Sequence, residues 1–204
     1  MSKLFKKYAG TYGDIGCFSA HPLKNLNAIG DAGYLITNNK KYYEKIKDLS
    51  NHGMTIRNRV KNFGYVSRMD NLQAAFLNFK LKNLNKVIKK RRLNYNIYKK
   101  YLPKKVFFPI EKKEEFNTYH TFVIQVNDRN NLRNFLLKNK IITSIHYPVP
   151  IHLQPAARRL GYKKGDFPVT EIQSRKILTL PIHQDLKKSD IKRVCKLINK
   201  FVGK

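Results

Sequence analysis

Short apolar runs bounded by Gly, Pro, Asn or Ser recur along this chain, and each is expected to form a strand of a packed sheet. The four runs that fit this pattern lie at residues 14–19, 33–37, 121–126 and 141–145. The last two flank a helical segment, which predicts a compact β-α-β arrangement in the second half of the chain.

Other segments place apolar residues at every third or fourth position, as expected of amphipathic helices. These segments are residues 40–50, 69–101, 129–139 and a C-terminal stretch that begins at Ser189-Asp190. Asn38-Asn39 and Asp128 precede two of them and are typical N-cap residues. Strands and helices therefore mix along the chain, which favours an α/β class.

The pattern changes near residues 101–110, where the long helical segment ends before Pro103. We predict two domains on either side of this point. Residues 1–105 are expected to be part of a larger α/β domain, and residues 106–204 a small α+β domain. Within the second, residues 148–168 hold four of the eight prolines and predict a long loop with a short helix.

The formal charge of +29 raises the possibility of nucleic-acid binding. The lysines are spread along almost the whole chain together with many asparagines and isoleucines, which is the bias that AT-rich codons produce. No helix-turn-helix, RNP-type or Cys/His finger pattern accompanies the charge. A nucleic-acid partner is therefore not our expectation, although a basic surface can attract a diphosphate-linked substrate.

Cysteine and hydropathy patterns exclude several other classes. Cys17 and Cys195 lie in apolar patterns without metal-ligand spacing, and we expect two buried thiols in a reducing cytoplasm. No apolar stretch approaches the roughly 20 residues of a spanning helix. The first residues, Met1 to Lys7, lack the apolar core of a signal peptide. We therefore expect a cytoplasmic protein with no membrane partner and no metal site.

The segment Gly13 to Gly33 carries the strongest chemical signal. A strand ending at Ser19 is broken by His21-Pro22, Lys24 follows on a loop, and glycines mark the return into the next strand. A lysine held rigidly and partly desolvated loses its proton more readily than one in water. Because only the neutral amine attacks a carbonyl, Lys24 is a candidate Schiff-base residue.

This segment, G-D-I-G-C-F-S-A-H-P-L-K-N-L-N-A-I-G-D-A-G, resembles the lysine loop of the DegT/DnrJ/StrS-type aminotransferases. Further motifs of that family follow in its order. They are Asn51-His52-Gly53, the run G-Y-V-S-R-M-D-N-L-Q-A-A over residues 64–75, Ile145 to Pro148 and Leu178 to His183. The resemblance implies the aspartate-aminotransferase-like fold (fold type I) with pyridoxal 5′-phosphate as cofactor.

The resemblance also implies roles for individual residues. Lys24 would be the catalytic, cofactor-linked lysine, and Ser19 and Arg68 would contact the cofactor. His146 and Tyr147 would contact the substrate. At position 66 the family usually has an asparagine that reaches the phosphate in the partner subunit of a homodimer. Val66 cannot donate that hydrogen bond.

In the family, an aspartate upstream of the lysine loop pairs with the pyridine nitrogen. Here Asp14 is the only acid among the 23 residues before Lys24, and it belongs to the lysine-loop strand itself. The resemblance therefore implies that this chain corresponds to the C-terminal portion of a longer enzyme, and we expect little activity from the chain alone.

Three functions remain as alternatives at this point. The first is an aminotransferase that moves an amino group, typically from glutamate, to a nucleotide-linked keto-sugar for surface polysaccharide. The second is a non-catalytic remnant that dimerises with a full-length relative. The third is a basic nucleic-acid-binding module. The motifs favour the first, but the sugar, the ring carbon and the nucleotide are not encoded in any recognisable pattern.

Overall fold

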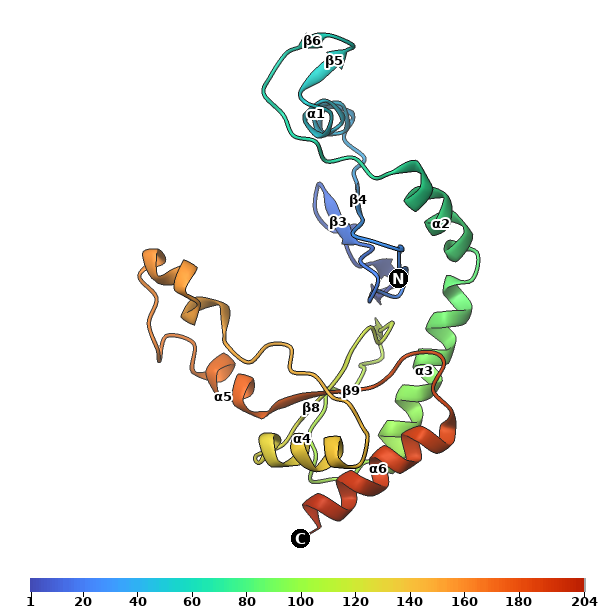
Figure 1. Ribbon diagram of the computed structural model, residues 1–204, viewed down its shortest axis with the longest axis vertical. Coiled ribbons are helices and arrows are strands. Elements are labelled where there is room, and N and C mark those ends of the chain that lie inside the picture. The colour runs from blue at the N-terminus through green and yellow to red at the C-terminus, as the bar shows by residue number, and fades with distance from the viewer. Residues whose placement is uncertain (204) are drawn as a thin grey trace. The chain divides into compact units, whose positions relative to one another are not determined.

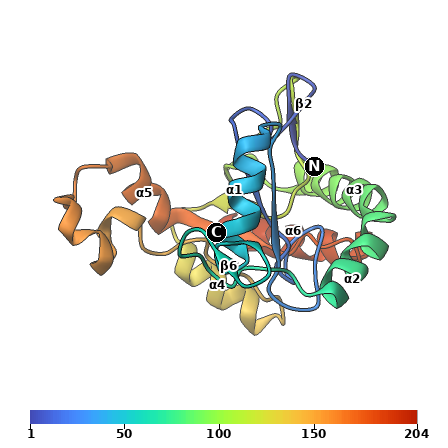
Figure 2. The same ribbon diagram turned by 90° about the horizontal axis from the view of Figure 1, so that it is seen from above.

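A computed structural model describes residues 1–203, which group into two compact units (Figures 1 and 2). The first unit comprises Met1–Ile88 and Lys112–Thr118, and the second comprises residues 89–111 together with the chain from Tyr119 onward. These units do not test the predicted division into domains at residues 105 and 106, which stays a prediction.

In the first unit, short antiparallel strand pairs alternate with helices. Three strands, in the order β2-β1-β7, form its largest sheet, and β3–β4 and β5–β6 are separate pairs. In chain order its elements are β1 (Lys3–Leu4), β2 (Lys7–Tyr8), β3 (Gly16–Ser19), β4 (Gly33–Ile36), α1 (Lys40–Ser50), β5 (Met54–Ile56), β6 (Arg59–Val60), α2 (Asn71–Leu81), the start of α3 (Leu84–Tyr101) and β7 (Glu115–Phe116).

The second unit is built on one antiparallel pair of strands, in which Phe122 lies opposite Leu180. Its elements after the rest of α3 are β8 (Phe122–Gln125), α4 (Arg129–Lys138), the 3₁₀ helices η1 (Ile151–Leu153) and η2 (Pro155–Leu160), α5 (Pro168–Lys176), β9 (Ile177–Leu180) and α6 (Lys188–Val202). Figure 1 shows α4 and α6 together with the β8–β9 pair.

The main hydrophobic core of the described chain lies in the second unit, where α3, α4 and α6 cover the strands. Its fully buried side chains include Tyr98, Ile124, Leu132, Leu178 and Ile198. The Tyr98 hydroxyl donates a hydrogen bond of 2.7 Å to the Pro181 carbonyl, and the Asn94 amide donates one of 2.8 Å to the His183 carbonyl. These side-chain bonds fix the segment after β9 to α3.

Several predicted elements are confirmed. The strands at 14–19, 33–37 and 121–126 correspond to β3, β4 and β8, and the helices at 40–50 and 129–139 correspond to α1 and α4. Asn39 caps α1, because its side-chain oxygen accepts from the N–H groups of Lys41 and Tyr42. Asp128 precedes α4, but its carboxylate accepts from the Asn131 amide instead of a backbone group.

Other expectations are wrong. Residues 141–145 form no strand, since Ser144 alone makes an isolated bridge to Thr179, and the partner of β8 is β9. The helical pattern over 69–101 is two helices, α2 and α3. The predicted last helix is present as α6, but it begins at Lys188 with Lys187 in the N-cap position, so Ser189 and Asp190 lie inside its first turn.

The two cysteines also differ from each other. Cys195 is buried in the core of the second unit, whereas Cys17, on β3, is exposed. The expectation of two buried thiols is therefore wrong for Cys17, because its alternation along β3 places it on the open face of a two-stranded pair.

Candidate functional site

Residues 20–32, here called the lysine loop, leave β3 and return into β4. The two strands are antiparallel with Ser19 opposite Gly33. Main-chain bonds close the loop immediately beyond this pair, since the Ala20 N–H donates to the Ala32 carbonyl at 2.8 Å and the Ala28 N–H to the Ala20 carbonyl at 2.9 Å. The loop is thus fixed at its base by backbone geometry.

Lys24 lies half-buried inside this loop. Its N–H donates to the His21 carbonyl at 2.8 Å, and the Leu23 N–H donates to His21 Nδ1 at 3.2 Å. The His21 N–H in turn donates to Ser19 Oγ at 3.3 Å. His21 therefore braces the turn that carries Lys24, and Ser19 stands at the strand end five residues earlier.

The lysine loop packs on α2, which follows Arg68 in the chain. Ala20, Ala28 and Leu77 form a small buried cluster, with Met69 packed against it. The Ile29 N–H also donates to Gln73 Oε1 at 2.9 Å. Arg68 itself is exposed and directly precedes Met69, whose side chain packs on this cluster.

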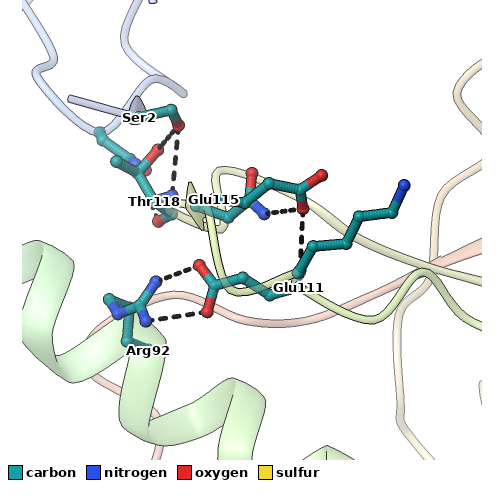
Figure 3. A network of polar contacts seen from close by, with 8 residues as sticks. Ser2, Arg92, Glu111, Glu115 and Thr118 are labelled. Carbon is teal, nitrogen blue, oxygen red and sulfur yellow. Dashed lines mark hydrogen bonds and ion pairs between the residues drawn. The ribbon is translucent and has the colours of Figure 1, made fainter. Parts of the chain in front are cut away.

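The residue after Lys24 anchors the loop from its other side. The Asn25 amide donates to the Thr118 carbonyl at 3.1 Å, and the Thr118 N–H donates to Ser2 Oγ at 3.3 Å. Figure 3 shows Ser2 and Thr118 facing each other in this network. Segments from three parts of the first unit therefore converge on the residue next to the candidate catalytic lysine.

Figure 3 also shows an ion pair of the second unit, between Arg92 and Glu111. Arg92 donates two parallel bonds of 2.6 and 2.9 Å to the two carboxylate oxygens. These bonds raise the pKa of Arg92 above its usual value. The forked geometry fixes the segment after α3, so this pair is structural support.

The residues present fit part of what pyridoxal phosphate requires. Lys24 offers an amine and Ser19 a hydroxyl that can donate to a phosphate oxygen. An acid against the pyridine nitrogen needs a sheltered position, and the Asp31 side chain on the loop is 96% exposed. Asp14 lies at the opposite end of the strand pair, where its carbonyl accepts from the Thr37 hydroxyl. Four strand residues separate the two ends, which is roughly 13 Å.

His146 and Tyr147 belong to the second unit and line a cavity of about 580 Å³. His146 Nδ1 lies 2.9 Å from the buried Thr179 Oγ1, and its ring meets that of Tyr147 edge-on at 5.4 Å. Pro148 to Ile151 with Gln154 form one wall of the cavity, and Thr170, Gln173, Ser174 and Ile177 form the other. Such a volume suits a small organic ligand.

A buried hydrogen-bonded pair, outside the lining itself, joins the two walls of this cavity. His152 Nε2 lies 3.1 Å from Glu171 Oε1, with side chains only 5% and 7% exposed. The Gly165 N–H donates to the same carboxylate oxygen at 2.7 Å. This backbone bond, and then the bond from His152, hold the pKa of Glu171 below its usual value. The pair connects η1 to α5, whose neighbouring residues line the cavity.

Sequence reasoning missed this pair, as well as Asn25, Gln73 and Thr179. His152 showed no metal spacing, and Glu171 sits in a segment with weak helical periodicity. Only Asn25 could have been identified from the sequence, because it directly follows Lys24 in the motif that resembles the family's lysine loop. The others act through partners that are distant in the sequence.

A sequence model of the DegT/DnrJ/EryC1/StrS aminotransferase family matches residues 2–199. The chain belongs to this family. It is 34% identical over 199 residues to the "pleiotropic regulatory protein" of Geobacillus stearothermophilus, covering 96% of this chain and 54% of that protein. It is 31% identical to a UDP-N-acetyl-3-dehydro-α-D-glucosamine 3-aminotransferase of Acidithiobacillus ferrooxidans, covering 94% and 52% respectively.

Solved structures agree with this membership. DesV from S. venezuelae superimposes with a TM-score of 0.95 at 28% identity, over all of this chain and 55% of DesV. A DegT/DnrJ/EryC1/StrS aminotransferase from Brucella abortus gives a TM-score of 0.93 at 28% identity, again over 100% and 55%. The family member described here therefore has the α/β fold of pyridoxal-phosphate-dependent transferases of fold type I.

The chain spans about half the length of the curated relatives it matches. Within residues 1–203, no helix is both long and apolar enough to cross a membrane. Over the same residues, no group of three or more His, Cys, Asp or Glu side chains gathers as a metal site.

Proposed function

We propose that this family member acts as a pyridoxal-phosphate-dependent aminotransferase. Its substrate would be a nucleotide-linked keto-sugar, and Lys24 would be the catalytic lysine. The observation that carries the proposal is the position of Lys24, half-buried on a loop closed by backbone bonds and packed on α2. The relatives with named sugar substrates support the substrate class. Glutamate as amino donor, a cytoplasmic location and a role in surface polysaccharide are part of the same proposal.

When bound, pyridoxal phosphate supplies an electron sink for the carbon that loses its proton. Lys24 would hold the cofactor through its amine, and the released amine would carry a proton to or from the reacting carbon. Ser19 would donate its hydroxyl to the phosphate, and the bond that its Oγ accepts from the His21 N–H would orient that hydroxyl. His146, fixed by Thr179, and Tyr147 offer donors to the sugar nucleotide.

Arg68 and position 66 concern a homodimer. In the proposed dimer, Arg68 reaches toward the cofactor of the neighbouring subunit, and Val66 leaves the neighbouring phosphate without the amide donor typical of the family. Val66→Asn is therefore expected to strengthen cofactor binding in the dimer. An unchanged affinity would count against a family-like interface at this position.

The first test traps the covalent link between a lysine and the cofactor by borohydride reduction and locates it by peptide mapping. We expect the label on the peptide that contains Lys24, and its loss in Lys24→Arg. Lys45→Arg, an exposed lysine on α1, is the matched control and should label normally. A label on another lysine in the unchanged chain would refute the assignment.

Ser19→Ala gives a finer test of the same site. Loss of a hydrogen bond to a charged phosphate is expected to weaken cofactor binding by roughly 1–3 kcal/mol. Equal affinity of the variant and the unchanged chain would reduce Ser19 to a strand-end residue.

Turnover tests the completeness of the site. Because neither Asp14 nor Asp31 is placed to hold the pyridine proton, the 204-residue chain alone is expected to show no appreciable amino transfer. The missing acid would be supplied by a complementing segment from a close relative. Robust turnover from glutamate to a nucleotide keto-sugar without that complement would contradict this account.

The second candidate is a non-catalytic partner of a full-length relative. It is favoured by the apolar side chains that α2 leaves exposed, with Leu72 at 72% and Phe79 at 63%. Mixed chains that co-purify yet never label at Lys24 would favour this candidate over the first.

A further inference from the structure

Helix α6 carries lysines at four positions spaced by four residues, all exposed to solvent. They are Lys188, Lys192, Lys196 and Lys200, here called the lysine row. Residues four apart lie on one face of a helix about 6 Å apart along its axis, so the row extends over roughly 18 Å. The opposite face of α6 is buried in the core of the second unit through Ile191, Val194 and Ile198, so α6 presents the row outward.

The row is not neutralised by its surroundings. Asp190 is the only acid on α6, and its carboxylate accepts from the Lys187 N–H at the start of the helix. In the part of the chain that the structure describes, no carboxylate makes an ion pair with any of the four lysines. Like charges four residues apart repel and destabilise a helix. The row is therefore a stripe of uncompensated positive charge, which is complementary to an anionic surface.

An apolar cavity lies at the end of the row. Val126, Phe135, Phe201 and Val202 line about 580 Å³ of space, and the rest of the lining is Lys105, Asn127, Asp128 and Lys200. The rings of Phe135 and Phe201 lie 5.7 Å apart, so α4 and α6 together form its aromatic side. Asp128 is the single acid of the lining, and it is engaged by the Asn131 amide. Two ammonium groups beside an apolar cavity suit a ligand with an anionic head and an apolar tail.

We propose that the lysine row and this cavity form a docking surface for an anionic phospholipid membrane. The row would contact several headgroups at once, while Lys105 and Lys200 would hold the headgroup of one lipid whose acyl chain enters the cavity. A nucleic-acid duplex would satisfy the row but has no apolar tail for the cavity. The proposal is independent of the aminotransferase site.

Vesicle sedimentation tests the proposal with the 204-residue chain. Vesicles of 70% phosphatidylcholine and 30% phosphatidylglycerol are compared with pure phosphatidylcholine at 0.1 M salt. The row variant changes Lys188, Lys192, Lys196 and Lys200 to Gln, which retains helix propensity. We expect binding to the anionic vesicles only, and at least about 50-fold weaker partitioning for the row variant.

The matched control changes four exposed lysines of α1 to Gln, namely Lys40, Lys41, Lys45 and Lys47. Both variants lower the formal charge of +29 by four, but the α1 lysines do not form a single row. The control should bind within about threefold of the unchanged chain. Equal losses in the two variants would assign binding to overall charge and overturn the proposal, as would no binding by the unchanged chain. Circular dichroism checks that both variants fold.

Two further measurements distinguish a phospholipid membrane from a nucleic acid as the ligand of this surface. If a 20-base-pair DNA duplex binds more tightly than the vesicles and the row variant loses both equally, the row is a nucleic-acid surface and the proposal fails. Soluble dihexanoyl phosphatidylglycerol should shift the amide resonances of Phe201 and Val202. Vesicle binding without those shifts would remove the cavity from the docking surface.

Discussion

The lysine loop and the cavity around His146 are held in place by different kinds of interaction. The loop is closed by backbone bonds between residues close in sequence, such as Ala20 with Ala32. The cavity walls are joined by buried side chains, since His152 of η1 meets Glu171 of α5. A backbone-held loop tolerates changes of side chain but depends on the space around its main chain, whereas a wall joined by side chains depends on the identity of two residues.

The two units also differ in the exposure of their cysteines. This difference leads to the largest expected effect, which is on the rate of thiol modification. Burial raises the pKa of the Cys195 thiol to about 12, so only about one molecule in ten thousand is ionised at pH 8. Exposed Cys17, at the base of the lysine loop, should react with a maleimide at least about a hundredfold faster. Mass spectrometry of timed samples measures both rates, and Cys17→Ser identifies the fast one.

Comparable reaction rates for Cys17 and Cys195 would mean that the core of the second unit opens often enough to expose Cys195 to the maleimide. The contrast between an open strand pair and a closed core would then not describe the protein in solution.

The next effect concerns the backbone of β3. A Cβ atom built at Gly16 would lie 2.1 Å from the Gly10 carbonyl oxygen, so Gly16→Ala must displace main chain. We expect a loss of about 2–3 kcal/mol in the free energy of unfolding. Gly13→Ala, whose Cβ would meet nothing within 4 Å, is the control and should change stability by less than about 0.5 kcal/mol. Urea unfolding followed by circular dichroism measures both, and equal effects would contradict a main-chain constraint.

The smallest effect concerns the pair behind the cavity. The bonds from Gly165 and His152 hold the pKa of Glu171 below its ordinary value of 4.5. The ionised carboxylate therefore stabilises the fold above pH 4.5, and this contribution is lost as the pH falls through the lower pKa of the folded state. Glu171→Gln should be less stable at pH 7 and should lose less stability than the unchanged chain between pH 6 and pH 3.

Glu44→Gln, at an exposed position of α1, is the control for this measurement. Its acid dependence should match that of the unchanged chain. Parallel curves for the unchanged chain and Glu171→Gln would show that the buried pair does not contribute through its charge.

Sequence patterns correctly predicted the elements that depend on interactions between residues close together in the chain. The apolar runs of β3 and β4, the Asn39 cap and the helical periods of α4 and α6 are local signals, and each corresponds to an element. The site residues on the lysine loop came from a motif of the same local kind. Their chemical roles stay predictions.

The predictions failed where residues that are distant in the sequence determine the secondary structure. Ile141 and Thr143 are buried like strand residues, yet only Ser144 pairs with the sheet, through its bridge to Thr179 of β9. Helix α5 was missed because its buried residues, Glu171 and Ser174, are polar. Their burial is permitted by His152, Gly165 and backbone carbonyls that no local pattern identifies.

The bonds from α3 to the segment after β9 have a consequence for the order in which the protein is made. Tyr98 and Asn94 find their acceptors 83 and 89 residues later, at Pro181 and His183. During synthesis α3 therefore leaves the ribosome long before its partners exist, and its apolar face has no strand β9 or helix α6 to cover it. The second unit becomes a folded body only when the last residues emerge. A nascent chain halted before residue 177 would expose this helix to chaperones.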